Sequence, residues 1–458
     1  MANCKSAFLF MLCVLGSLPT RAHAEGWQAG TARVAITPKT PTWMAGYAAR
    51  KGPSEGVIHD LWAKALVLKD ARGNVGLLVT IDVCGVDRAL SARIRDVIQT
   101  RHKLDRSRVV LACSHTHCGP VVGHNLLTMY KLDDAQAARV REYTEEFVKG
   151  VLEAADKAFE RLEPVELAWG RGLVDFAVNR RENAETKVAE LRGKLALKGP
   201  VDHDVPVLRV RGGDGKDKAI VFGYACHCTV LDLNKLCGDY AGFAQIAVEK
   251  AHPEAQAMFV AGCGADQNPQ PRRQLNHAEQ HGRALAGAVD ATLAGPLRPI
   301  APNFSTAYEE IPLAFDKLPT AAEVEAQTKD ANFFIASRAR MLRETIAAHG
   351  KLSPTYPYPV QVWNLGEGEV TWIFLGGEVV VDYALRIKRN IDPAHAWITA
   401  YANDVMAYIP SLRVLKEGGY EGATAMIYYA RPAPWSTNVE EDIMASIARL
   451  LKKIHVLK

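Results

Sequence analysis

The residue types best suited to chemistry gather at the ends of short apolar runs. The first group is CSHTHCGP, residues 113–120, which follows the apolar run Val109 to Ala112. Side chains two apart on a strand share a face, so we predict that His115 and His117 point the same way. Two imidazoles on one side can hold a metal ion, or one can hold it while the other moves protons. The pair alone leaves a structural role open.

Two further segments carry polar groups after apolar runs. YACHCT, residues 224–229, places His227 between two cysteines. A single histidine is compatible with a buried structural role as well as with metal binding. AGCGADQNP, residues 261–269, has glycines that let backbone amides approach a ligand. It lacks the spacing of a P-loop or a dinucleotide fingerprint, so no nucleotide cofactor is predicted.

Three other histidines are interpreted as structural. His277 and His281 stand four residues apart on an expected helix, but Ala278 occupies the position that a zinc protease gives to glutamate. We interpret them as part of a solvated face. His203 lies between two aspartates before an expected strand and is interpreted as a loop cap. The G-x-S-x-G pattern is absent, so a serine esterase is not indicated.

The elements that must position these segments alternate between strands and helices. Strands are predicted at 75–83, 109–112, 205–210, 219–224 and 258–261. Helices are predicted at 140–159, 277–293 and 321–349, and a last helix is predicted to start at a capping box at residues 437–440 and to end at residue 454. A hairpin is predicted at 358–373. Polar residues at the ends of buried strands are typical of α/β sheets. We predict an α/β fold with a mixed β-sheet core flanked by helices, in one unit at 25–458 with a weak boundary near 296–305.

Composition narrows the function classes. The chain has 458 residues, of which 48% are hydrophobic and 23% charged, as in globular proteins and unlike disordered or fibrous ones. The net charge is +4 with no dense basic run, so nucleic acid is not an expected partner, and no obligate protein partner is indicated. Seven cysteines lie beyond residue 24. This odd number implies at least one free thiol, and their pairing cannot be assigned from the sequence.

Residues 1–24 have the features of a secretory signal peptide. Lys5 precedes an apolar stretch from Ala7 to Leu18, and Ala22-His23-Ala24 fits a cleavage site before Glu25. An uncleaved anchor is the alternative, but the apolar run is short for a membrane span. We therefore expect a secreted or periplasmic protein.

Together these motifs resemble the neutral/alkaline, non-lysosomal ceramidase family, zinc amidases that hydrolyse the N-acyl bond of ceramide. The likeness is carried in order by residues 30–32 (GTA), 36–38 (ITP), 44–47 (MAGY), 58–60 (IHD), 63–66 (AKAL), 81–82 (ID), 115–117 (HTH) and 179–180 (NR). The order of these short pieces is specific. The resemblance implies a neutral-ceramidase-like catalytic domain, and we expect that catalytic region without the family's C-terminal immunoglobulin-like domain.

The resemblance also implies roles for seven residues. One zinc ion would be held by His115, His227, Glu378 and Tyr408. His117 would assist proton transfer or substrate binding, and Arg180 would contact the substrate near the scissile group. Asn268 stands where the family has a serine. An amide can donate to a developing oxyanion but is not a nucleophile.

The implied reaction is hydrolysis of an amide by a zinc-activated water. His117 would pass a proton to the leaving amine, while Arg180 and Asn268 would stabilise the oxyanion. The expected substrate is a small-molecule or lipid N-acyl compound, with transient contact to a membrane surface. Two alternatives stay open: a zinc hydrolase of the same fold acting on a non-lipid amide, peptide or ester, and a non-catalytic metal- or lipid-binding homologue. In the family that the chain resembles, the region after Arg180 borders the substrate cleft, so the polar stretch at 181–200 implies a less hydrophobic substrate.

Overall fold

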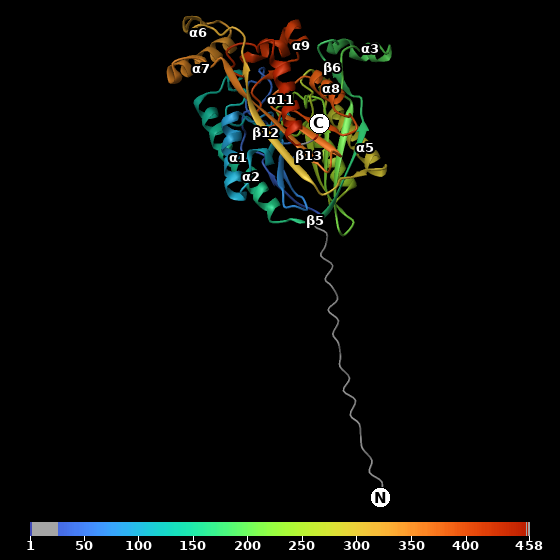
Figure 1. Ribbon diagram of the computed structural model, residues 1–458. Coiled ribbons are helices and arrows are strands. Elements are labelled where there is room, and N and C mark those ends of the chain that lie inside the picture. The colour runs from blue at the N-terminus through green and yellow to red at the C-terminus, as the bar shows by residue number, and fades with distance from the viewer. Residues whose placement is uncertain (2–25, 455, 457–458) are drawn as a thin grey trace.

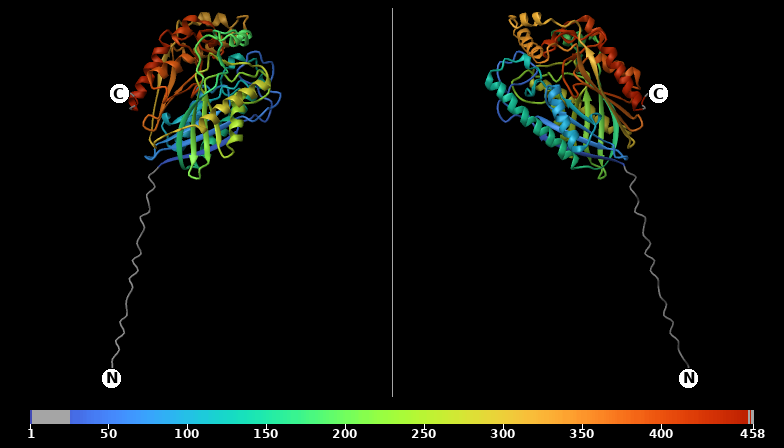
Figure 2. Two further views of the ribbon diagram at one scale, coloured as in Figure 1. Left: turned by 90° about the vertical axis from the view of Figure 1, so that its right-hand side faces the viewer. Right: turned by 60° about the vertical axis from the view of Figure 1, so that its left-hand side comes forward.

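Two β-sheets packed face to face form the centre of the protein, and helices lie on their outer sides (Figures 1 and 2). The computed structural model describes residues 1, 26–454 and 456. Apart from Met1, the predicted signal peptide lies outside these residues. Among the helices of this part of the chain, none combines the length and the hydrophobicity that a membrane span needs.

The large sheet is mixed, as predicted. Its strands, in spatial order, are β4 (Val109–Cys113), β3 (Val75–Ile81), β2 (Trp62–Lys69), β1 (Trp27–Ala35), β5 (Glu163–Leu173), β7 (Asp204–Gly212), β8 (Asp217–Tyr224) and β9 (Gln256–Ala261), with β11 (Arg298–Pro299) beside β5. The pairs at the two edges, β3–β4 and β8–β9, are parallel, and the pairs between them are antiparallel. The edge strands β4 and β9 contact each other, so the sheet curls.

Four helices cover the outer side of the large sheet. They are α1 (Arg88–His102), α2 (Asp134–Phe159), α4 (Asp239–Ala251) and α5 (Leu275–Ala294). In α2 the buried residues Val140, Tyr143, Phe147 and Val151 recur at helical spacing and pack against β1 and β2, as the periodicity predicts. This apolar stripe anchors the helix, and Asp133 caps its start by accepting from the Gln136 N–H.

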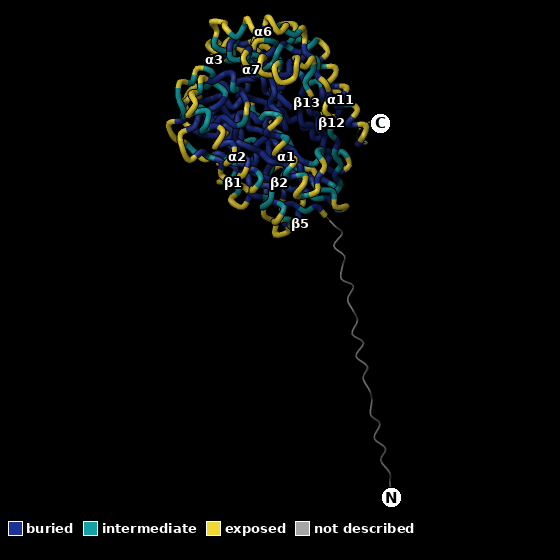
Figure 3. Tube along the Cα trace, turned by 90° about the vertical axis from the view of Figure 1, so that its left-hand side faces the viewer, coloured by how far each residue is buried: buried dark blue, intermediate teal, exposed yellow. Residues whose placement is uncertain are grey.

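The second sheet packs on the other side of the large one. It consists of β12 (Phe304–Ala314), β13 (Thr355–Leu365), β14 (Val370–Leu375) and β16 (Ala396–Thr399). The β13–β14 pair is antiparallel, which confirms the predicted hairpin. Tryptophans fill the space between the sheets, and the rings of Trp372 and Trp397 stack with centroids 3.9 Å apart. Helix α11 (Val439–Lys453) covers β12 and β13, and Figure 3 shows the buried interior that results.

Two predicted helices differ in the structure. The expected helix at 321–349 is divided into α6 (Ala321–Gln327) and α7 (Phe333–His349). Between them the Asp330 side chain accepts from the Asn332 N–H, and the Asn332 side chain starts α7 by accepting from the Phe334 N–H, which offers the backbone an alternative to continuous helix. The capping box predicted at residues 437–440 does not form. Instead, Glu440 binds Arg386 and the Leu412 N–H.

Short elements beside the sheets carry much of the remaining chemistry. They are β6 (Ala177–Asn179), α3 (Val188–Gly193), β10 (Gln267–Pro269), β15 (Glu378–Val379), α8 (Val381–Asn390), β17 (Tyr408–Ile409), α9 (Leu412–Glu417) and α10 (Gly419–Gly422). Strand β6 pairs with β10, and β15 pairs with β17. These two small ladders join segments that lie far apart in the sequence.

Candidate active site

Both histidine segments lie in loops just beyond the ends of strands. β4 ends at Cys113 and β8 at Tyr224, and the loops run side by side, since the His117 N–H donates to the Cys228 carbonyl at 3.2 Å. The predicted strand alternation at His115 is therefore wrong. His115 has a φ of 59°, in the left-handed region that non-glycine residues rarely adopt. This turn still brings His115 Nε2 within 3.1 Å of His117 Nε2.

A buried cluster forms where the predicted ligands meet. His115 Nε2 and His227 Nε2 each lie 3.1 Å from Glu378 Oε2. Tyr408 is paired with Glu378 across the β15–β17 ladder, and its hydroxyl lies 3.3 Å from His227 Nε2. All four side chains are buried. His115, His227 and Glu378 form a group that could hold a metal ion, and we call these three residues and Tyr408 the metal centre as the candidate ligands.

The hydrogen bonds of the two imidazoles show that this cluster fits a cation. His115 Nδ1 lies 2.6 Å from the Cys84 carbonyl oxygen, and His227 Nδ1 lies 2.8 Å from that of Gly264. A carbonyl only accepts, so each Nδ1 carries a hydrogen, and each imidazole in its neutral form presents a lone pair at Nε2. Two lone pairs facing one carboxylate oxygen repel unless a cation lies among them. Apart from these two imidazoles, Glu378 Oε2 has no hydrogen-bond partner in the described part of the chain.

The spacing and the chemistry of these groups suit zinc. Ligand atoms around a tetrahedral zinc ion lie about 3.3 Å from one another, since each is about 2.0 Å from the metal. The 3.1 Å separations in the cluster are close to this value. Two imidazoles with one carboxylate are also a ligand set that catalytic zinc sites use. The residues present therefore fit the metal that the resemblance implies.

The electrostatics of the cluster point the same way. Burial acts to raise the pKa of Glu378, but His115 and His227 hold it well below its usual range. Burial acts to lower the pKa of His115, yet the Cys84 sulfur and the Glu378 carboxylate raise it to about 10, so without a metal ion a proton occupies the Nε2 position that faces Glu378. Burial and the Arg180 charge lower the pKa of His227 to about 4. The cluster thus holds an ionised carboxylate that favours a positive charge beside it.

His117 lies beside this cluster and is enclosed by the segment around Gly46. Its ring meets the Tyr47 ring edge-on, with centroids 4.8 Å apart. Gly46 has a φ of +92°, and a Cβ on this residue would lie 2.4 Å from His117 Nδ1. Only glycine allows the chain to approach the imidazole this closely. Burial, together with the charges of His115 and His227, lowers the pKa of His117 well below its usual value.

Arg180 connects the metal centre to Asn268. The β6–β10 ladder sets Val178 opposite Asn268, so Arg180 emerges next to that amide. Its Nη2 donates to the Tyr408 hydroxyl at 3.2 Å, and its Nη1 donates to Asn268 Oδ1 at 3.3 Å. Its Nε donates to Glu421 Oε1 at 2.7 Å. A continuous set of contacts therefore brings all seven candidate residues together.

Sequence reasoning missed four residues that support these groups. The Tyr429 hydroxyl donates to Glu378 Oε1, and the Tyr401 ring stacks on His115 with centroids 4.2 Å apart. Cys84 Sγ lies 3.6 Å from His115 Nδ1, and Glu421 binds Arg180. Only Cys84, which closely follows a predicted strand, has any local signal.

The three histidines interpreted as structural bind backbone carbonyls. His277 Nδ1 lies 3.2 Å from the Arg272 oxygen, and His281 Nε2 lies 2.7 Å from the Pro271 oxygen. His281 is buried, so its assignment to a solvated face is wrong. His203 Nε2 lies 2.9 Å from the Ala177 oxygen, which agrees with a role in its loop.

Comparison with known proteins places the chain in a family. The family model described as neutral/alkaline non-lysosomal ceramidase, N-terminal, matches residues 27–270. The chain belongs to this ceramidase family. Neutral ceramidase from Pseudomonas aeruginosa is 22% identical to it, over 98% of this chain and 76% of its own. Neutral ceramidase A from Dictyostelium discoideum is 26% identical, over 52% of this chain and 35% of its own.

Solved structures of the ceramidase family share the fold. The crystal structure of neutral ceramidase from P. aeruginosa superposes with a TM-score of 0.71, covering 93% of this chain and 74% of that one at 17% identity. This match confirms the predicted neutral-ceramidase-like α/β fold. As a member of the ceramidase family, the chain is a hydrolase.

Proposed function

We propose that the chain is an exported, zinc-dependent amidase that hydrolyses the N-acyl amide bond of a ceramide-like or other N-acylated substrate. The main support is the approach of His115 Nε2 and His227 Nε2 to Glu378 Oε2, each at 3.1 Å, with both Nδ1 atoms bound to carbonyls. These residues would hold the zinc, with Tyr408 beside them. When bound, zinc supplies a Lewis acid that polarises a carbonyl and lowers the pKa of a water.

His117 is positioned to move the proton in this reaction. Its Nε2 lies 3.1 Å from His115 Nε2, and Gly46 and Tyr47 restrict its ring. It would take a proton from the attacking water and give it to the nitrogen of the leaving amine. In this role His117 borders the metal centre and is not needed to hold the ion.

Arg180 and Asn268 are positioned to bind the substrate carbonyl as it becomes negative. Glu421 and Tyr408 fix the guanidinium of Arg180. Because Asn268 Oδ1 accepts from Arg180, the Asn268 Nδ2 group is left to donate. Donors fixed before the reaction stabilise an oxyanion without reorganisation, and each contributes about 10²–10³ in rate.

Metal content and turnover of point variants test this proposal. After dialysis with zinc, the wild type should hold one zinc ion per chain, while His115→Ala, His227→Ala and Glu378→Ala should lose it. His117→Ala should keep zinc while kcat falls by about 10²–10⁴-fold. His124→Ala is the matched control, because its side chain is 72% exposed and outside the site. A wild type that stays well below one zinc per chain contradicts the proposal.

The proposal of export depends on residues 1–24 and has its own test. Expression of the full chain with fractionation of the cells should recover it from the periplasm or the medium. N-terminal sequencing should then begin at Glu25. An uncut chain that stays in the cytoplasm contradicts export without affecting the chemistry.

A further inference from the structure

A cleft of about 650 Å³ opens beside the metal centre. Arg180, Asn268 and Tyr420 line it, and Arg180 donates to Tyr408 at 3.2 Å, so the cleft borders the metal centre. Its walls come from residues 178–188, from 268–270 and from 417–421. We call it the substrate cleft. Most of its lining side chains are charged or carry an amide, and Val178, Val188 and Tyr420 are the main apolar ones.

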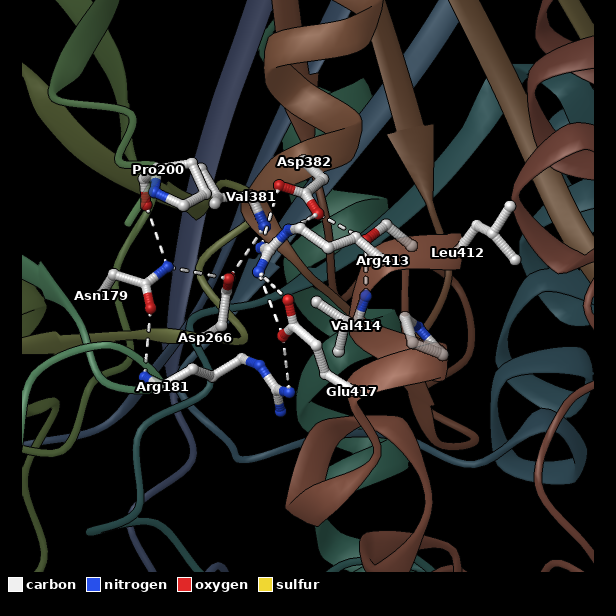
Figure 4. A network of polar contacts seen from close by, with 12 residues as sticks. Asn179, Arg181, Pro200, Asp266, Val381, Asp382, Leu412, Arg413, Val414 and Glu417 are labelled. Atoms are coloured by element: carbon white, nitrogen blue, oxygen red, sulfur yellow. Dashed lines mark hydrogen bonds and ion pairs between the residues drawn. The ribbon is translucent and has the colours of Figure 1, made fainter. Parts of the chain in front are cut away.

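The charges in the cleft wall are already paired. Arg180 Nε and Arg181 Nη1 each donate to Glu421 at 2.7 Å. Figure 4 shows Arg181 and Arg413 pointing at Glu417 from two sides, with N–O distances of 3.0 Å. A long alkyl chain laid over these ion pairs would remove their water and offer no hydrogen bond in return. The wall is therefore poorly suited to an alkyl chain.

Two amides in the cleft still have hydrogen-bonding capacity. Gln270 is 7% exposed, and its side chain makes no hydrogen bond with the described residues. Asn268 is 8% exposed, and only its Oδ1 is engaged, by Arg180. Both residues line the cleft. Amides that line a cleft and have unused donors and acceptors are matched by an uncharged ligand with hydroxyl or amide groups, which can both donate and accept.

We infer that the substrate cleft selects an N-acyl amide with one compact, uncharged arm bearing hydroxyl or amide groups, such as an N-acylated amino sugar, instead of two long alkyl arms. This inference rests on the proposed function and narrows it to a substrate class. Gln270 would bind the polar arm, while Asn268 beside it binds the carbonyl of the scissile amide at the metal centre. Hydrogen bonding to a polar group gives stronger discrimination than fitting a hydrocarbon, because a wrong ligand leaves buried amides unpaired.

Three amides of similar size test the inference on the zinc-loaded chain. N-hexanoylglucosamine has a polar amine arm, N-hexylgluconamide has a polar acyl arm, and N-hexylhexanamide has two alkyl arms. We expect kcat/KM for one of the polar amides to exceed that for the dialkyl amide by at least about tenfold. If the chain hydrolyses any of the three and neither polar amide is preferred, the inference is wrong.

A variant shows whether the cleft amides cause the preference. Gln270→Met keeps the size of the side chain and removes its hydrogen bonds. It should lower kcat/KM for the preferred polar amide by about three- to tenfold, the effect of one lost hydrogen bond, and leave the dialkyl amide unchanged. Gln28→Met, on β1 and outside the cleft, is the matched control. An equal loss on both substrates contradicts the assigned role of Gln270.

Binding separates this inference from the proposed function. Calorimetric titration of zinc-loaded His117→Ala with each amide measures recognition without turnover. Tighter binding of a polar amide supports the inference even if the wild type hydrolyses none of the three, a result that would overturn the proposed amidase. Hydrolysis of all three without any binding preference would overturn the inference and leave the amidase standing.

Discussion

The metal centre and the substrate cleft lie side by side, but they are built in different ways. In the metal centre, backbone carbonyls hold both imidazoles, and a β-ladder holds Glu378 against Tyr408. The cleft is lined partly by the β6–β10 ladder and mostly by loops and short helices, and ion pairs join its charged side chains. Groups fixed by backbone can be positioned closely for chemistry, whereas loops change more easily. The difference suggests a constant reaction combined with an adjustable specificity.

Arg180 lines the cleft and donates to Tyr408 of the metal centre, and its removal gives the largest effect among the changes at the boundary between the two regions. Arg180→Ala removes a donor from the oxyanion position, so kcat should fall by about 10²–10³-fold with zinc content unchanged. Arg180→Lys should recover only part of this loss, because a lysine cannot span Tyr408, Asn268 and Glu421 together. Arg343→Ala, on exposed α7, is the control. If Arg180→Ala also loses zinc, the metal centre and the substrate cleft are not independent of each other.

Tyr429 tests the metal centre by itself. Its hydroxyl donates to Glu378 Oε1, which leaves Oε2 facing the two imidazoles. Tyr429→Phe should weaken zinc binding by about 10–100-fold, as the loss of a partner that orients a ligand does. Competition with a chelator measures this change, and kcat at saturating zinc should be almost retained. Tyr428→Phe is the matched control, and unchanged zinc affinity in Tyr429→Phe would contradict this role.

Some site residues are positioned by local structure and others by contacts between distant segments, and only the first kind can be found from the sequence. His115 and His227 follow apolar runs, and those runs are strands within a residue or two of the predicted limits. Strand ends are local features, so the two histidine segments can be found from the sequence. The reason given for His115 and His117 was nevertheless wrong, because a left-handed turn after Cys113 brings their rings together.

The remaining site residues are positioned by contacts between segments that lie far apart in the sequence. Glu378 and Tyr408 are joined by a parallel ladder across 30 residues, and only the family resemblance pointed to that pair. Glu421 lies in the short helix α10, where no periodic pattern marks it, yet it binds both Arg180 and Arg181. The order of strands in the large sheet likewise depends on long-range pairing. Such features follow from tertiary packing and leave no local signal.

The ion pairs at the rim of the cleft should give the smallest effect. The Glu417 side chain is 38% exposed, and solvent screens its attraction to Arg181 and Arg413. Glu417→Gln should therefore lower the free energy of unfolding by less than about 1 kcal/mol. The Glu421 side chain is only 5% exposed and pairs with two arginines, so Glu421→Gln should cost several times more, because it weakens the pairing of two guanidinium groups. Urea unfolding measures both changes. Equal losses in the free energy of unfolding would mean that the ion pairs at the rim stabilise the fold as much as those next to the metal centre.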